Sequence, residues 1–174
     1  MNGLLAVRGL EIEVATPCAA WIGACRDAEA IAAAAARVAL AHALAGRSVL
    51  TDQRLVIGIR LSDDREQRHL NHAYRGQDRP TNVLSFPLAD LVEPRPPGSP
   101  VLLGDVVLAF ETVRREADQQ HKPLADHLRH LVVHGVLHLL GFNHEGEIEA
   151  EAMEGCEVEI LAALGVPDPY RDTM

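Results

Sequence analysis

The segment from His134 to His144 constrains this chain more than any other. It places two histidines four residues apart, then a glycine, then a third histidine. Side chains four residues apart lie on one face of a helix, so His134 and His138 are expected to point the same way. Gly141 can adopt the left-handed backbone that ends a helix, and that turn can bring His144 back toward the pair. The segment therefore predicts a helix that ends in a cluster of three histidines.

Three imidazoles suit a catalytic metal site better than a structural one. They leave one coordination position for water, and bound Zn²⁺ lowers the pKa of that water to about 7. We therefore expect one Zn²⁺ ion, held by His134, His138 and His144, and a hydrolytic reaction. Two alternatives stay open on spacing alone. His130 is also four residues from His134, and histidines on an amphipathic helix can be ordinary core or surface residues.

The same spacing matches the metzincin protease pattern H-E-x-x-H-x-x-G-x-x-H, except that Gly135 stands at the glutamate position. That glutamate is the general base of those proteases, and glycine cannot take up a proton. The sequence predicts a metzincin-like zinc helix without the protease mechanism. A metallohydrolase acting on a peptide or amide remains an alternative, as does a non-catalytic assembly factor with a structural metal.

The rest of the chain predicts one domain, residues 1–174, of alternating strands and helices. Asp27 is the expected cap of the first helix, and Asp63 lies at the start of the second. Strands are predicted at 4–14, 54–61, 81–86 and 101–110, and helices at 28–45, 62–74, 111–120, 123–141 and 146–164.

Composition narrows the class of protein. No run of about eighteen apolar residues predicts a membrane span, and the N-terminus lacks the pattern of a secretory signal, so we expect a cytoplasmic protein. Cys18, Cys25 and Cys156 have no C-x-x-C spacing, which disfavours both a disulfide framework and a cysteine-rich structural zinc site. The sequence leaves the oligomeric state open.

Three motifs together resemble the YbeY family of ribosomal RNA maturation endoribonucleases. They are the histidine segment, YRGQDRPTNVLSFP at 74–87 and LGD at 103–105, and the likeness extends over roughly residues 50–170, including DPY at 168–170. The resemblance implies an α+β fold, with a mixed sheet of about four strands packed with helices and one zinc site formed by the three histidines. It also implies zinc-dependent cleavage of single-stranded RNA in small-subunit ribosomal RNA 3′-end processing and in ribosome quality control.

Arg75 matches the arginine that the family associates with activity, and we predict it to be catalytic. A guanidinium can clamp phosphate oxygens and stabilise charge in a phosphoryl-transfer transition state. Alternatively, Arg75 pairs with Asp78, and Arg79 is a weaker candidate for the phosphate contact. Asp105 is a candidate to support a ligand histidine. Asn143 departs from the family's usual aspartate before the third histidine.

The net charge of −9 opposes nonspecific binding of RNA, but the charges are unevenly distributed. We expect a basic side that faces RNA and an acidic last helix that faces solvent or a basic ribosomal protein. Aromatic residues make up only 3% of the chain, so the composition indicates no platform for stacking bases. The basic residues are Arg54, Arg60, Arg65, Arg68, Arg75 and Arg79, and the acidic ones are Glu145, Glu147, Glu149, Glu151, Glu154, Glu157 and Glu159.

Overall fold

The computed structural model describes residues 9–45, 53–88 and 93–171. The strands are β1 (Leu10–Ala15), β2 (Leu55–Ser62), β3 (Val83–Pro87) and β4 (Val101–Ala109). The helices are α1 (Ala20–Ala24), α2 (Ala28–Ala43), α4 (Asp64–Arg75), α5 (Phe110–Gln119), α6 (Leu124–Leu139) and α7 (Glu147–Ala163). None of the helices in this part of the chain is both long enough and apolar enough to cross a membrane.

The four strands form one mixed sheet in the order β1-β2-β4-β3. β1, β2 and β4 run parallel, and β3 pairs with β4 in the antiparallel sense. This confirms the predicted α+β class and the mixed four-stranded sheet. β3 therefore lies at the edge of the sheet, where one of its sides is open to other parts of the molecule.

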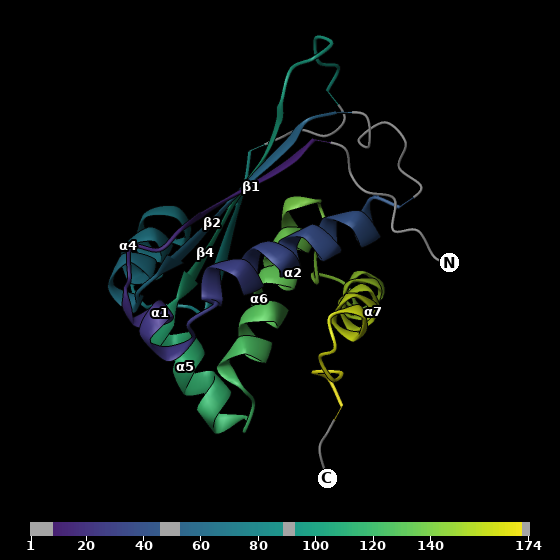
Figure 1. The fold of residues 1–174 in the computed structure, drawn as a ribbon. Coiled ribbons are helices and arrows are strands. Elements are labelled where there is room, and N and C mark those ends of the chain that lie inside the picture. The colour runs from purple at the N-terminus through teal and green to yellow at the C-terminus, as the bar shows by residue number, and fades with distance from the viewer. Residues whose placement is uncertain (1–8, 46–52, 89–92, 172–174) are drawn as a thin grey trace.

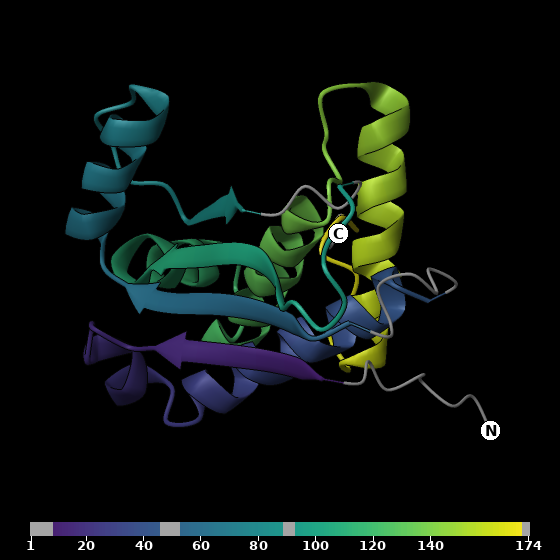
Figure 2. The ribbon, with the colours of Figure 1, turned by 90° about the horizontal axis from the view of Figure 1, so that it is seen from above.

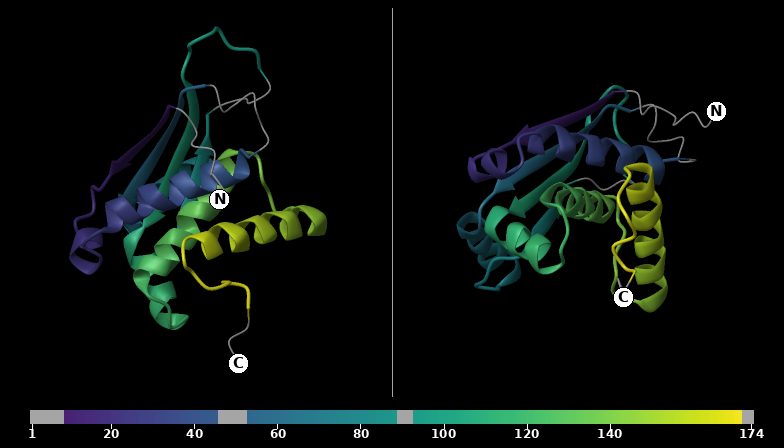
Figure 3. Two further views of the ribbon diagram at one scale, coloured as in Figure 1. Left: turned by 45° about the vertical axis from the view of Figure 1, so that its right-hand side comes forward. Right: turned by 60° about the horizontal axis from the view of Figure 1, so that its bottom comes forward.

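Helices α2 and α6 pack against each other and against one face of the sheet (Figure 1). β2 presents Leu55, Ile57, Ile59 and Leu61 to the core at every second position, and all four are buried. α7 lies beside α2 and α6, and α4 lies at the opposite end of the molecule (Figures 1 and 3). The helical layer therefore holds α6 between the sheet and α7.

α4 has the side-chain cap that the sequence predicts, whereas α2 begins at the predicted residue, Ala28, without one. The Asp63 side chain accepts a hydrogen bond from the backbone N–H of Glu66 at 2.9 Å, and Gly76 ends α4 with φ of +68°. Asp27 makes no capping hydrogen bond, because its φ of −98° and ψ of 21° are not the extended backbone of a capping residue. Burial of its alanine-rich face against the core stabilises α2 instead.

Two features near the N-terminus differ from the prediction. β1 begins at Leu10 and runs to Ala15, and residues 4–8 of the predicted strand lie outside the described residues. The short helix α1 was not predicted. It buries Trp21 completely, and the indole N–H donates to the carbonyl of Ser62 at 2.8 Å. One tryptophan therefore fixes the turn between β1 and α2 against the end of β2.

Candidate metal centre

The three predicted histidines lie together at the end of α6. His134 and His138 come from its last turns, and Gly141 has a left-handed φ of +95°, which confirms the predicted turn toward His144. The Nε2 atoms of His134 and His138 are 3.0 Å apart, and one ring nitrogen from each of the three histidines lies within 4.8 Å of the others. The three side chains could therefore hold one metal ion.

Hydrogen bonds on the far side of each ring set the tautomer of the neutral His134 and His138 imidazoles. The Nδ1–H of His134 donates to Glu157 at 2.5 Å, and the Nδ1–H of His138 donates to the carbonyl of Phe142 at 2.9 Å. Each Nε2 then carries a lone pair, and two such atoms cannot hydrogen-bond to each other. A metal ion shared by the two atoms would accept both lone pairs, so the donor set fits a metal ion of the kind that imidazole prefers.

The environment also favours the neutral form of His138, which is the form that binds metal. Burial is the main cause that lowers the pKa of His138, and the nearby His134 and His144 lower it further. The hydrogen bond to the Phe142 carbonyl and the charge of Glu157 act in the opposite direction, and burial outweighs them.

Glu157 of α7 supports the histidine cluster, although the sequence predicts that the glutamates of this helix face solvent or a basic protein. Its side chain is 0% exposed and also accepts hydrogen bonds from His130 Nε2 at 3.2 Å and from the hydroxyl of Tyr170. Burial, the largest single influence, raises the pKa of Glu157. The hydrogen bonds from His130, His134 and Tyr170 and the charge of His134 together outweigh it and lower the pKa to about 2. Glu157 is therefore a buried carboxylate that orients His134.

A signal for Glu157 was present in the sequence. The residues buried on α7 are Met153, Glu157, Ile160 and Leu161, which recur at the spacing of one helical face. An acidic residue on such an apolar face needs a partner inside the protein. In the sequence, the buried Glu157 is hidden among the exposed glutamates of the same helix.

Asp105 does not support a ligand histidine, contrary to the prediction. Successive residues of a strand point to opposite faces of the sheet. Val106 of β4 lies against α6 at Gly135, so Asp105 points away from the histidines. Its side chain is exposed and lies beside Gly58 on the other face of the sheet.

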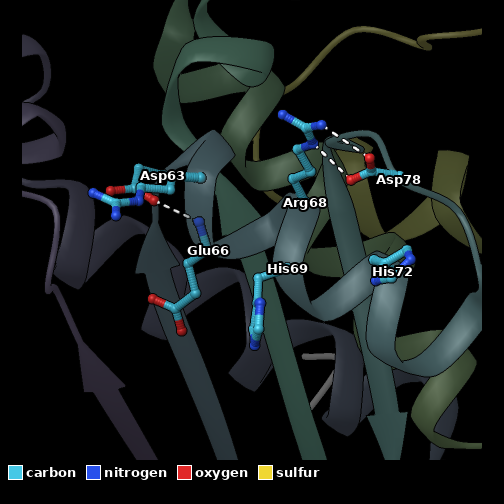
Figure 4. Close-up of a pocket in the computed structure, with 7 residues that line it drawn as sticks. Asp63, Glu66, Arg68, His69, His72 and Asp78 are labelled. Atoms are coloured by element: carbon cyan, nitrogen blue, oxygen red, sulfur yellow. Dashed lines mark hydrogen bonds and ion pairs between the residues drawn. The ribbon is translucent and has the colours of Figure 1, made fainter.

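Arg75 lies at the C-terminal end of α4 and lines a cavity of about 510 Å³ together with His134, His138 and His144. The alternative pairing with Asp78 is wrong. Arg68 occupies that carboxylate, with two hydrogen bonds of 2.7 and 2.9 Å (Figure 4). Within the described residues, the guanidinium of Arg75 has no carboxylate partner and is free to bind an anion in the cavity.

The basic surface is smaller than the sequence predicted. Three of its arginines are neutralised by ion pairs: Arg54 with Glu11, Arg60 with Glu66 and Arg68 with Asp78. Arg79 donates two hydrogen bonds to the side chain of Gln77. Arg75 is thus the arginine from that group that faces the histidine cavity.

Gly135 explains why the protease glutamate is missing. It is buried where α6 packs on the sheet, and a Cβ atom added there would lie 2.6 Å from Val106 Cγ1 and 3.1 Å from Ser85 Oγ. Ser85 also donates a hydrogen bond of 3.0 Å to the Gly135 carbonyl. A glutamate at residue 135 would therefore clash with the sheet in this packing.

We expect Gly135→Ala to lower the free energy of unfolding by about 1–3 kcal/mol, because overpacking forces the sheet and α6 apart. Denaturant titration of the purified variant measures this change. Gly155→Ala is the matched control, because Gly155 is an exposed helical glycine with no atom within 4 Å of an added Cβ. The control should gain about 0.5–1 kcal/mol. Equal effects at the two positions would contradict the tight packing at Gly135.

Comparison with known proteins identifies the family. A family model for endoribonuclease YbeY matches residues 25–165. The chain belongs to the YbeY family. It is 52% identical to endoribonuclease YbeY of Paramagnetospirillum magneticum over 162 residues, which cover 92% of this chain and 96% of that protein.

Two further proteins are similar to the chain. It is 60% identical to endoribonuclease YbeY of Rhodospirillum rubrum over 119 residues, or 68% of this chain and 60% of that protein. The solution structure of TM1509 from Thermotoga maritima resembles the chain with a TM-score of 0.48 and 20% identity, over 93% of this chain and 99% of that one.

Asn143 stands where the YbeY resemblance led us to expect aspartate. Its side-chain oxygen accepts a hydrogen bond from the backbone N–H of Glu145 at 3.3 Å. An aspartate oxygen accepts the same bond, so the loop that carries His144 does not depend on the difference.

Proposed function

We propose that this chain is a zinc-dependent endoribonuclease that cleaves single-stranded RNA during maturation of ribosomal RNA. The observation that carries this proposal is one cavity lined by three histidines that could share a metal ion and by Arg75, which has no carboxylate partner among the described residues. Membership of the YbeY family supports the choice of RNA as the substrate. The whole chain, residues 1–174, acts as one metal-dependent hydrolase domain.

Each residue of the proposed active site has its own role. His134, His138 and His144 hold the ion, and Glu157 keeps the lone pair of His134 directed at it. When bound, Zn²⁺ supplies Lewis acidity and a nucleophile at neutral pH. Arg75 binds the phosphate that is to be cleaved and stabilises the negative charge that develops on its oxygens.

The setting follows from the family resemblance. We place the protein in the cytoplasm, where it acts on the 3′ end of small-subunit ribosomal RNA and in ribosome quality control. The exposed glutamates of α7, which exclude the buried Glu157, offer an acidic surface to basic proteins of the small ribosomal subunit.

The two other functions have less support. A peptide hydrolase of the metzincin type needs a base at residue 135, and that position is buried against the sheet. A structural metal normally has four protein ligands. Within the described part of the chain, the group that could hold a metal contains the three histidines alone and no cysteine.

Removal and return of the metal test the proposal. Purified protein is stripped with a chelator, restored with Zn²⁺ or with Mg²⁺, and given a labelled single-stranded RNA or an unstructured peptide. We expect RNA cleavage to disappear on stripping and to return with Zn²⁺, while the peptide stays intact. Peptide cleavage without RNA cleavage would overturn the proposal, as would RNA cleavage that survives stripping.

A further inference from the structure

Two hollows of the surface meet at Tyr74. One is the cavity that contains the three histidines and Arg75. The other is a groove of about 810 Å³ on the opposite face of the sheet, beside Gly58 and Asp105. The residues that line both are Tyr74, Ser85, Phe86 and Pro87. Edge strand β3 and the ring of Tyr74 therefore form the boundary between the two hollows.

The Tyr74 side chain is exposed to solvent but packs on one side against Phe86. It is 71% exposed, although a large aromatic side chain is usually much more buried. One side of its ring contacts Phe86 of β3, with centroids 5.1 Å apart and an interplanar angle of 60°. α4 ends at Arg75, so Tyr74 lies in its last turn, where the left-handed Gly76 turns the chain away. The ring is thus held by a helix and a strand while most of it faces solvent.

The position of Tyr74 beside Arg75 suggests what it binds. An RNA strand offers a phosphate and a base at each nucleotide, and neighbouring side chains on one helical turn can contact the two groups together. α4 lies on the far side of the molecule from α7 (Figure 2), and both residues belong to its last turn, at the rim of the histidine cavity. If Arg75 holds the phosphate in the cavity, the base of an adjacent nucleotide reaches the rim that Tyr74 forms.

We propose that Tyr74 stacks on an unpaired base next to the cleaved phosphate, and so favours single-stranded over double-stranded RNA. This inference rests on the proposed function. A base inside a duplex is already stacked and paired, so it cannot also cover the tyrosine ring. Base stacking on an aromatic ring tolerates any sequence, because every base has a π-face. The composition of 3% aromatic residues gave no sign of this, because it does not show where the aromatic residues meet.

Fluorescence and kinetics together test the proposal on the zinc-replete protein. A short single-stranded RNA carries 2-aminopurine, whose fluorescence falls on stacking, at one position at a time around the cleavage site. The variants are Tyr74→Leu, Tyr74→Phe and the control His69→Ala, which changes a residue of α4 in a separate hollow on the outer side of that helix (Figure 4).

We expect the wild-type protein to quench the probe at one or two positions beside the cleaved phosphate. Tyr74→Leu should lose that quenching and should raise KM for single-stranded RNA about tenfold with little change in kcat. Its preference for single-stranded over double-stranded RNA should fall by about the same factor. Tyr74→Phe and His69→Ala should behave like the wild type.

Three results overturn the inference. The first is that Tyr74→Leu binds and cleaves RNA like the wild type. The second is that the wild-type protein quenches 2-aminopurine fluorescence at no position of the RNA. Both leave the proposed function standing, provided that the wild type cleaves RNA. A wild-type protein that does not cleave RNA overturns the proposed function and the stacking role with it.

Discussion

Arg75→Ala is expected to lower kcat on single-stranded RNA about 10²–10³-fold and to leave the zinc content unchanged. Loss of one preorganised donor to a developing negative charge costs about this much in enzymes where it has been removed. Arg75 shares its cavity with the three histidines but contacts none of them through a hydrogen bond that the structure records. The loss should therefore fall on catalysis and not on metal binding.

Single-turnover cleavage by purified, zinc-replete variants measures this effect. Arg75→Lys should recover part of the rate, because an ammonium keeps the charge but not the planar, two-pronged geometry. Arg79→Ala is the matched control, since Arg79 is a nearby arginine whose guanidinium donates to Gln77. Loss of zinc from Arg75→Ala, or an equal loss of rate in Arg79→Ala, would contradict the assignment.

Glu157→Gln is expected to weaken zinc binding about 10–100-fold, the usual cost of removing a carboxylate that orients a ligand histidine. The amide can still accept one hydrogen bond from His134, but it carries no negative charge to hold the imidazole in place. Tyr170→Phe removes only the hydroxyl that donates to Glu157, so it should weaken zinc binding less.

Competition with a chelator of known affinity measures the zinc dissociation constant of each variant. Glu159→Gln is the control, because Glu159 lies two residues further along α7, is exposed and pairs with His42. An unchanged zinc affinity in Glu157→Gln would show that His134 does not need this carboxylate. If Glu159→Gln weakened zinc binding equally, the cause would be the total negative charge of α7 and not the hydrogen bond to His134.

Local spacing accounts for the parts of the site that the sequence predicted. His134 and His138 share a face because a helix repeats every 3.6 residues, and Gly141 turns the chain because only glycine adopts its backbone easily. These are properties of about ten consecutive residues. They need no knowledge of the rest of the fold, and the structure places all three histidines together.

Contacts between distant residues account for the parts that were missed. Glu157 lies 23 residues from the histidine that it orients, and nothing in either segment alone reveals the pairing. The role expected of Asp105 failed for the same reason, because the direction of a strand side chain depends on which face of the sheet α6 covers. The predicted basic surface was overestimated because the carboxylates of Glu11, Glu66 and Asp78 lie beside its arginines only in the folded chain.

In the proposed enzyme, His134, His138 and His144 hold the metal that cleaves RNA. The most direct test of this assignment is the zinc content and RNA cleavage of the wild type, His138→Ala and His130→Ala, all purified in the same way. The expected result is one zinc ion per chain and cleavage in the wild type and in His130→Ala, with both lost in His138→Ala. Zinc and activity that survive in His138→Ala but disappear in His130→Ala would contradict the account, because they would place the metal on the other pair of histidines.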